Sequence, residues 1–462
     1  SAGRPSLRTG AESYPLRYPL AKTRRSRHNR PAMSTPRIAV VAGARTPFTK
    51  AGSTQKRVPA YELGRVALRE ALERAGVAPE DLDEVIFGNI AQPADSTNIA
   101  RVVALRAGCP PATSAYTVNR NCGSALQAMA DAMLRMETGR ADLIAAGGTE
   151  SMSLIPLLFP ESMKAKMERV LRARTPAARL AAFAGLRGAD FKPILGLLVG
   201  LTDNFCGLNM GETAEVLARE FGISREEQDA YALRSHERAS AAQKEGRLAA
   251  EITPVPLPPD YRSFATEDLG IRHEQSMAAL AKLPPAFDRR YGTVTAGNAS
   301  QITDGAAALI LASERAARER RLPVLGWVRS VEFAALAPAR MGLGPVHAAP
   351  RALDRAGVEM RSIGLVEINE AFAAIVLANL KAFASDAFAR EELGRSRALG
   401  AVDPDRLNVN GGAIALGHPV GASGARLVLT LLHEMKRRDV ELGLASLCIG
   451  GGQGAAAVLE RA

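Results

Sequence analysis

The sequence predicts an α/β protein built from two similar halves, with a mostly helical segment inserted between them. Three observations lead to this. The segment 71–77 recurs as 352–358 with one difference, Asp354 in place of Glu73. Each half has apolar, strand-like runs alternating with amphipathic helices, which is typical of right-handed strand–helix–strand units with parallel strands. The 462 residues, 47% of them apolar, can bury a large core and are too many for one simple domain.

In the first half, the repeat at 71–77 ends a helical stretch and leads into a short strand, 85–87. A second strand, 115–121, is followed by a helix and then by the strand 141–146. The predicted apolar face of this helix consists of Leu126, Met129, Ala130, Met133 and Leu134.

The second half follows the same order. Its repeat precedes the strand 365–368, and a strand at 407–410 precedes a helix and the strand 443–449. The predicted apolar face of this helix consists of Leu427, Val428, Leu431, Leu432 and Met435. We interpret both faces as core positions, since an apolar stripe usually marks the buried side of a helix. Two such halves packed together form a layered α/β duplicate.

The segment at about 152–290 has a different composition. Its helix candidate, 225–243, is highly charged, and 162–187 is dense in Lys and Arg. We therefore predict an inserted, mostly helical loop domain within an N-terminal half at 36–315, and a C-terminal half at 316–462.

The net charge of +11 is concentrated at the N-terminus, where residues 1–32 hold eight Lys or Arg and one acid, and so +7 of the total. We predict that 1–35 form a disordered basic extension. This extension is either a mitochondrial import peptide or an upstream stretch before Met33, and its prolines favour the second, with a cytoplasmic protein. Aromatic residues do not alternate with the charges, so we expect no nucleic acid partner.

The four cysteines, Cys109, Cys122, Cys206 and Cys448, show neither metal-ligand spacing nor the density of a disulfide scaffold. They indicate a reducing compartment and no metal site. The longest apolar run, 194–201, is far shorter than the roughly 20 residues of a membrane-spanning helix.

Two reactive side chains lie at equivalent strand–helix turns of the two halves. Cys122 opens the first helix, where the helix N-terminus is expected to lower the pKa of its thiol. His418 lies in the corresponding turn of the second half, among glycines that allow a substrate close to the backbone. A pseudo-twofold relation between the halves would bring both into one cleft.

A third candidate, Cys448, ends the strand 443–449 and precedes a glycine-rich turn. The stretch 450–455 fits a variant of the dinucleotide-binding fingerprint, but too few residues follow to complete that unit. The same backbone amides suit an oxyanion hole.

Five motifs together resemble the thiolase family, in order and at family-like spacing, over about 37–462. They are the segments 118–124 around Cys122, 292–300 ending in Ser300, 369–372 starting at Asn369, 417–424 around His418, and 448–454 starting at Cys448. The resemblance implies the thiolase-like fold of two α/β halves in αβαβα layers, and an acyltransferase that acts on 3-ketoacyl-CoA.

The resemblance also implies roles. Cys122 would attack the 3-keto carbon and carry the acyl group, His418 would be the base for Cys122 and for the CoA thiol, and Cys448 would be the acid and base at the acetyl carbon. His418 with a water held by Asn369 would form one oxyanion hole, and the backbone amides of Cys122 and Gly450 the other. Ser300, with its neighbours Asn298 and Ala299, would bind CoA. CoA would be a cosubstrate, with no permanently bound cofactor.

Within the family, the stretch 208–236 and the run 385–391 resemble the thiolase subunit of fatty-acid trifunctional complexes. Asn369 and Ile449 instead follow the wider family, and Ala125 stands where the family usually has Gly. We expect a degradative 3-ketoacyl-CoA thiolase of β-oxidation, a homodimer or homotetramer, with a possible enoyl-CoA hydratase/3-hydroxyacyl-CoA dehydrogenase subunit as partner. The alternatives are an acetoacetyl-CoA thiolase in the condensation direction and a non-catalytic acyl-CoA or lipid carrier.

The basic residues of 162–187 and the apolar run 194–201 resemble an interfacial amphipathic element. Peripheral membrane contact through 162–201 is one reading of this segment. The other is a solvated helical face that covers the acyl pocket.

Overall fold

The computed structural model describes residues 37–462. The predicted basic extension at 1–35 lies outside this range. None of the helices within 37–462 is both long and apolar enough to cross a membrane.

The first half forms a mixed sheet in the order β1–β10–β5–β3–β4. Its strands are β1 (Ile38–Arg45), β3 (Glu84–Gly88), β4 (Ser114–Val118), β5 (Leu143–Glu150) and β10 (Thr303–Ser313), and a short β2 (Thr49–Lys50) pairs with β10. β3 runs parallel to β4 and β5, and β10 runs antiparallel to β1 and β5.

The second half repeats this order as β11–β14–β13–β12. Its strands are β11 (Gly326–Ala335), β12 (Leu365–Ile368), β13 (Leu442–Ile449) and β14 (Gln453–Arg461). At the place that β4 occupies in the first half, Leu407 makes an isolated parallel bridge with Val366. β1 pairs antiparallel with β11, Ile38 opposite Val328, and this joins the two halves into one continuous sheet.

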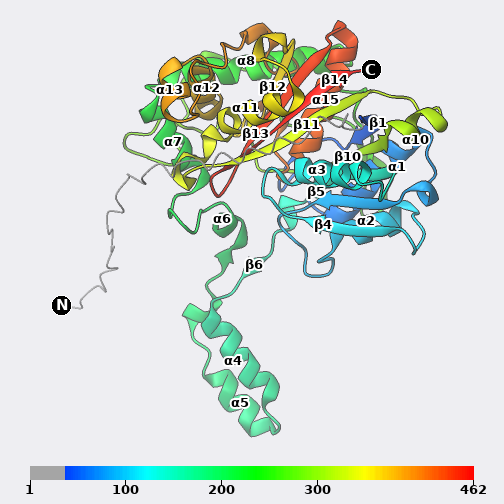
Figure 1. The fold of residues 1–462 in the computed structure, drawn as a ribbon. Helices are drawn as coiled ribbons and strands as arrows, with labels where there is room; N and C mark the ends of the chain where they lie inside the picture. The colour runs from blue at the N-terminus through cyan, green and yellow to red at the C-terminus, as the bar shows by residue number, and fades with distance from the viewer. Residues whose placement is uncertain (1–36) are drawn as a thin grey trace. The chain divides into compact units, whose positions relative to one another are not determined.

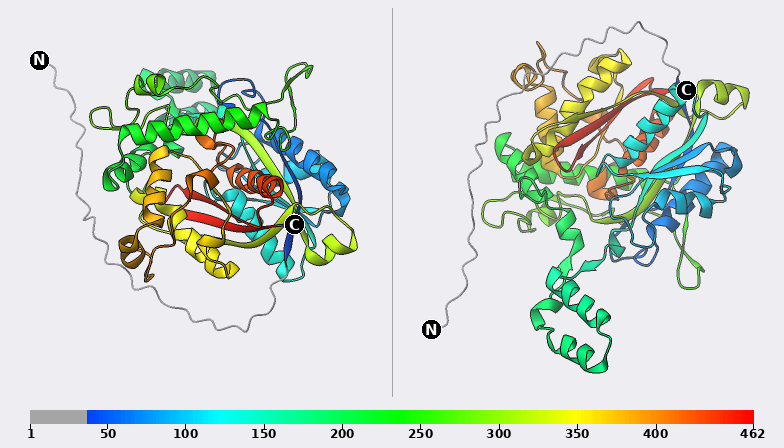
Figure 2. Two further views of the ribbon diagram at one scale, coloured as in Figure 1. Left: turned by 90° about the horizontal axis from the view of Figure 1, so that it is seen from above. Right: turned by 60° about the horizontal axis from the view of Figure 1, so that its bottom comes forward.

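Helices cover the sheets in three layers (Figure 1; Figure 2). α1 (Ala60–Ala75) and α2 (Ile99–Ala107) pack on the outside of the first sheet, α11 (Gly344–Ala356) and α12 (Ala373–Phe383) on the outside of the second. α3 (Ser124–Glu137) and α15 (Ser423–Arg438) share one apolar core with strands of both halves. The result is the predicted αβαβα arrangement. The shorter α10 (Glu314–Glu319), α13 (Asp386–Glu391) and α14 (Ala413–Leu416) lie in connections.

The repeated segment ends a helix in both halves, as predicted. Gly76 follows α1 with φ 64° and Gly357 follows α11 with φ 70°, a left-handed conformation that only glycine adopts without strain. Each glycine N–H bonds back to carbonyls of the last helical turn. The strands predicted next, at 85–87 and 365–368, are β3 and β12.

Three predictions in this region are wrong in detail. The strand expected at 115–121 stops at Val118, because Asn121 takes a left-handed conformation (φ 44°) that a strand cannot contain. The segment 407–410 makes isolated bridges only. On α3, Leu126 and Met129 are buried as predicted, but Leu134 is 59% exposed. The helix also buries its small residues, Ala125, Ala128 and Ala132, which allow the close packing between the sheets. The face predicted for α15 is fully buried.

The insert is mostly helical, as predicted. Its helices are α4 (Glu161–Arg172), α5 (Pro176–Ala184), α6 (Gly196–Gly200), α7 (Met210–Glu220), α8 (Arg225–Lys244) and α9 (Met277–Ala281). It also has two antiparallel strand pairs, β6 (Leu157–Leu158) with β7 (Ile194–Leu195) and β8 (Val255–Leu257) with β9 (Ser263–Ala265). α7 and α8 contact α12, whereas α4 and α5 pair with each other and extend away from the sheets (Figure 1; Figure 2).

Candidate active site

Cys122 lies in the tight turn between β4 and α3. The Ser124 hydroxyl donates to Asn121 O at 2.7 Å and accepts from Arg120 N at 2.8 Å, which fixes the turn. Gly123 packs against Ile449, whose Cδ1 would lie 2.5 Å from any Cβ at this position. Glycine at this position lets the Cys122 turn approach the end of β13, where Cys448 lies.

A side-chain amide joins these two turns. Asn121 Nδ2 donates to Gly450 O at 2.8 Å, and the Gly450 backbone makes a hydrogen bond to Cys122 that favours its thiolate. The predicted pair of amides, Cys122 and Gly450, thus lies together at the mouth of the Cys122 turn. Such amides are suited to stabilising an oxyanion.

The structure corrects the prediction for the Cys122 thiol. Burial raises its pKa to about 11, and the Gly450 hydrogen bond offsets this only in part; the carboxylate of Glu150 adds to the rise. A helix N-terminus stabilises a thiolate by a modest amount, whereas desolvation of a charge can shift a pKa by several units. The resting thiol is protonated, and it needs a base.

His418 is held in an orientation that suits a base. Its Nδ1 lies 2.5 Å from Ser423 Oγ, and Ser423 Oγ donates to Pro419 O at 3.0 Å. With its one proton directed at Pro419, Ser423 can only accept from Nδ1–H, so Nε2 carries the lone pair. Burial, and secondarily Arg426, lowers the pKa of His418 to about 4, so the imidazole is neutral.

Asn369 faces the free nitrogen of His418. It follows the end of β12, its backbone N donates to Ser446 O at 2.9 Å, and its Nδ2 lies 3.5 Å from His418 Nε2. Asn369 Oδ1 is buried and has no protein partner among residues 37–462. The two side chains predicted to form one oxyanion hole are therefore neighbours.

The His418 turn packs directly on the strands of the first half. A Cβ at Gly148 would lie 1.9 Å from Gly421 O, and a Cβ at Gly88 would lie 2.6 Å from Ser124 Cβ and 2.8 Å from Gly421 O. These glycines let the His418 turn and the start of α3 meet at the ends of β3 and β5. The expectation that the two equivalent turns share one site agrees with this packing.

Ala125 takes part in the same contact. Its Cβ lies 3.4 Å from the position of a Cβ at Gly424, so its methyl group fills space between α3 and α15. Glycine on α15 accommodates the alanine that replaces glycine on α3.

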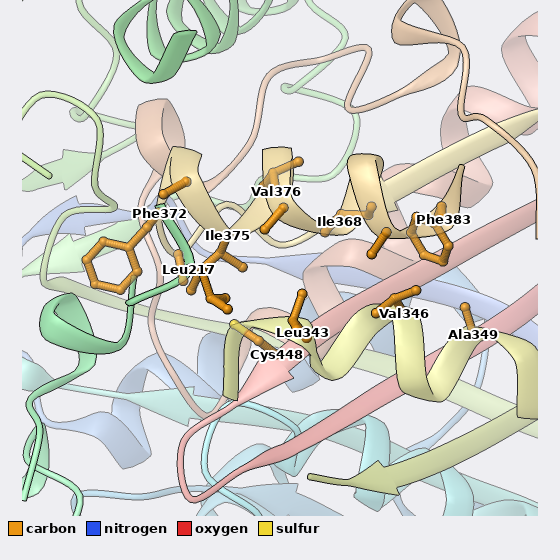
Figure 3. Packing of buried hydrophobic residues seen from close by; sticks show 14 of the residues in the cluster. Leu217, Leu343, Val346, Ala349, Ile368, Phe372, Ile375, Val376, Phe383 and Cys448 are labelled. Atoms are coloured by element: carbon orange, nitrogen blue, oxygen red, sulfur yellow. The ribbon is translucent and has the colours of Figure 1, made fainter. Parts of the chain in front are cut away.

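Cys448 is the second-last residue of β13 (Leu442–Ile449) and is 1% exposed. Figure 3 shows it beside Leu343 and Leu217 at one end of the apolar layer around α11 and α12. Burial raises its pKa well above the ordinary value, and the charge of an ionised Cys122 raises it further. Gly123 and Ile449, the residues that follow the two cysteines, are in contact, so ionisation of Cys122 would help to keep Cys448 protonated.

The block 298–300 lies against the segment that follows Asn369. Ser300 N donates to Ala371 O at 2.9 Å, and Ala299 pairs with Phe372. The Asn298 side chain bonds to Asp229, Thr293 and Thr295 at 2.8–3.1 Å, so it stabilises this turn. Of the three predicted CoA-binding residues, Ser300 alone combines partial exposure with a polar side chain.

Sequence reasoning gave no role to three residues that build this site. Ser423 orients His418, Thr303 Oγ1 accepts from His418 N at 3.1 Å, and Glu150 accepts from Gly421 N at 3.0 Å. Ser423 lies five residues after His418 in the same motif. The sequence could therefore have indicated this serine as a hydrogen-bond partner of His418. The other two contacts join residues more than a hundred positions apart.

Comparison with known proteins agrees with this geometry. The family described as "Thiolase, N-terminal domain" matches residues 38–315, and "Thiolase, C-terminal domain" matches 322–461. Proteins named 3-ketoacyl-CoA thiolase from Yersinia enterocolitica and Serratia proteamaculans are 44% identical over 425 residues, which cover 92% of this chain and 97% of each relative.

Solved structures show the same relation. Bacillus anthracis acetyl-CoA acetyltransferase superposes with a TM-score of 0.80 at 35% identity, covering 93% of this chain and 99% of that one. Human mitochondrial 3-ketoacyl-CoA thiolase in complex with CoA superposes with a TM-score of 0.79 at 37% identity, covering 93% and 98%. The chain belongs to the thiolase family.

Proposed function

We propose that the protein is a 3-ketoacyl-CoA thiolase of fatty-acid β-oxidation, which cleaves a 3-ketoacyl-CoA with CoA into acetyl-CoA and an acyl-CoA shortened by two carbons. The main support is the neutral His418, whose free Nε2 faces Asn369 and whose turn packs against the start of α3, where the protonated Cys122 lies. The relatives named 3-ketoacyl-CoA thiolase support the same assignment.

The geometry suits a reaction in which each proton that is released has a named acceptor. His418 Nε2 takes the proton of Cys122 as the sulfur attacks the 3-keto carbon, and the amides of Cys122 and Gly450 stabilise the resulting oxyanion. The C2–C3 bond then breaks, leaving the acyl group on Cys122 and an acetyl-CoA enolate, which takes the proton of Cys448. Asn369 and protonated His418 stabilise the enolate oxygen.

The second half of the route restores the enzyme. The proton on His418 returns to the Cys448 thiolate after acetyl-CoA leaves. His418 then takes the proton of an incoming CoA thiol, whose sulfur attacks the acyl group, and returns that proton to Cys122 as the acyl-CoA departs. Ser300 is the residue of the 298–300 block that we assign to contact with CoA.

A thiolysis assay tests this function. CoA-dependent loss of the 3-ketoacyl-CoA enolate absorbance is followed with acetoacetyl-CoA and with a long-chain 3-ketoacyl-CoA, for wild type, Cys122→Ala and the control Cys206→Ala. We expect turnover of the long-chain substrate that Cys122→Ala reduces by at least about 10³-fold, while Cys206→Ala is unchanged.

The other outcomes separate the alternatives. Activity confined to acetoacetyl-CoA favours the acetoacetyl-CoA thiolase, which works in the condensation direction. If neither substrate is turned over in a Cys122-dependent way, the remaining alternative is a non-catalytic acyl-CoA or lipid carrier.

The proposal includes partners. β4 is an edge strand with partly exposed residues, which supports a homodimer or a pair of dimers. Exposed apolar and basic residues of 162–201 support peripheral membrane contact. A 3-hydroxyacyl-CoA dehydrogenase forms the ketoacyl substrate, so a hydratase–dehydrogenase subunit is the chemically matched partner protein.

A further inference from the structure

Glu150 ends β5 directly beneath the turn that carries His418, and its side chain is 1% exposed. Its carboxylate accepts four hydrogen bonds. Oε1 accepts from Asn89 Nδ2 at 3.1 Å and Ala91 N at 3.0 Å, and Oε2 accepts from Ile90 N at 3.2 Å and Gly421 N at 3.0 Å. Within residues 37–462 no Lys, Arg or His forms an ion pair with it. A buried, unpaired carboxylate is costly, and amide donors compensate for it here.

One of these bonds reaches the catalytic turn. Gly421 lies three residues after His418, and its N–H shares Oε2 with the N–H of Ile90, so the carboxylate connects the His418 turn to the 89–91 loop. Thr303 holds the other end of the turn through His418 N. The turn is thus attached at two points to the sheet that also supports Cys122.

We propose that Glu150 is a positioning residue, whose ionised carboxylate fixes the His418 turn against the first half and so sets the place of the His418 imidazole relative to Cys122. The inference rests on the proposed thiolase function and adds to it a residue that acts through His418 and does not touch the substrate.

Ionisation of Glu150 is essential to this arrangement. All four partners are N–H donors, so all four need an oxygen that accepts. In a protonated carboxyl, or in the amide of glutamine, one of the two oxygens is replaced by a group that donates. That group would face two N–H donors and could not accept from both of them. Either the 89–91 loop or Gly421 would then lose its partner.

The surroundings place this ionisation near neutral pH. Burial raises the pKa of Glu150 to about 7; the hydrogen bonds from Ala91, Ile90 and Gly421 oppose the rise, and Asp304 on β10 adds to it. The other titratable groups that face this region are Cys122 and His418, both neutral in the resting site. The competent form exists above the pKa of Glu150 and is lost as the pH falls through about 7.

The experiment compares Glu150→Gln with Glu84→Gln. Glu84 begins β3 at the opposite end of the same sheet, is 6% exposed, and bonds to Ser114 and Arg135. It is therefore a matched buried carboxylate far from the site. Thiolysis of a 3-ketoacyl-CoA is measured from pH 5.5 to 8.5, with circular dichroism and melting temperature as checks of folding.

We expect Glu150→Gln to lower kcat by about 10- to 100-fold, with KM changed by less than about threefold. Wild-type kcat should rise with pH through about 7, and Glu150→Gln should lack this rise. Glu84→Gln should retain both the wild-type kcat and the rise. A pKa of about 4 for His418 cannot produce a rise near pH 7.

Two results would overturn the inference while leaving the function intact. One is a folded Glu150→Gln with wild-type kcat and pH profile. The other, which needs no variant, is a wild-type kcat that is flat from pH 5.5 to 8.5. Absence of Cys122-dependent thiolysis in the wild type would remove the proposed function itself.

Discussion

In the proposed reaction, the hydrogen bond between Ser423 and His418 decides which imidazole nitrogen is free to act as base. Because Ser423 gives its proton to Pro419 O, it accepts from Nδ1 and leaves Nε2 facing Asn369. Ser423→Ala removes this constraint, and the imidazole can then carry its proton on the wrong nitrogen. We expect kcat for thiolysis to fall by about 10-fold or more, with little change in KM.

Ser330→Ala is the matched control for this variant. Ser330 is also buried, and its hydroxyl donates to Ala352 O at 2.8 Å, far from the site. Ser423→Ala removes two hydrogen bonds and Ser330→Ala removes one, each at a cost of about 1 kcal/mol. If both variants stay folded at the assay temperature, a lower kcat in Ser423→Ala alone isolates the effect on His418. Equal kcat values for the two variants would show that Ser423 does not orient the base.

For single residues, the sequence predicted which side chains react but did not show their protonation states. Cys122, His418 and Cys448 stood out because each lies at a predicted strand end. Strand ends can be predicted from the local sequence pattern. The pKa of Cys122 depends on burial beneath segments far away in the sequence, and the local argument from the helix N-terminus gave the opposite direction. Glu150 escaped notice for the same reason, since its partner Gly421 is 271 residues away.

At the element scale, regular segments with clear end signals were predictable, such as β12 and the two helices closed by Gly76 and Gly357. The face of α3 was predictable in part. Leu126 and Met129 are buried as predicted, but the buried alanines of this helix carry little hydrophobic signal and yet pack most closely between the sheets. The insert was predicted by composition, and composition did not show that α4 and α5 leave the body of the protein (Figure 1).

The α4–α5 hairpin carries a prediction about membrane contact. Leu171, Leu180 and Phe183 are 77%, 73% and 47% exposed, with Arg172 and Arg179 among them. Exposed apolar residues surrounded by basic ones suit an anionic lipid surface, where each basic residue contributes about 1 kcal/mol. We expect flotation with vesicles of phosphatidylglycerol and phosphatidylcholine, and at least about a tenfold loss of binding in Arg172→Glu/Arg179→Glu.

A matched double reversal provides the control. Arg315 and Arg318 on α10 are also highly exposed helical arginines, and Arg315→Glu/Arg318→Glu makes the same change in net charge elsewhere. Vesicle binding that responds equally to both pairs indicates attraction by total charge alone. Binding that neither pair alters favours the solvated face that covers the acyl pocket.

At the scale of the whole molecule, the first sheet ends in an open edge. Among the strands of residues 37–462, β4 pairs only with β3, its five residues are at least partly exposed, and Tyr116 on this strand donates to Asp131 on α3 at 3.1 Å. One turn along α3, Leu134 is 59% exposed beside this edge. An unprotected edge next to an exposed apolar side chain invites pairing with a second copy.

Light scattering coupled to gel filtration tests this interface. We expect the wild type to have a mass of twice or four times the 48.9 kDa of the chain. Leu134→Lys should raise the dissociation constant of the oligomer by at least about tenfold, because it places an unpaired charge in the contact between copies. Leu171→Lys, at an even more exposed apolar position on the α4–α5 hairpin, should leave the mass unchanged. If Leu171→Lys dissociates the oligomer and Leu134→Lys does not, copies associate through the hairpin, and the β4 edge needs another explanation for its exposure.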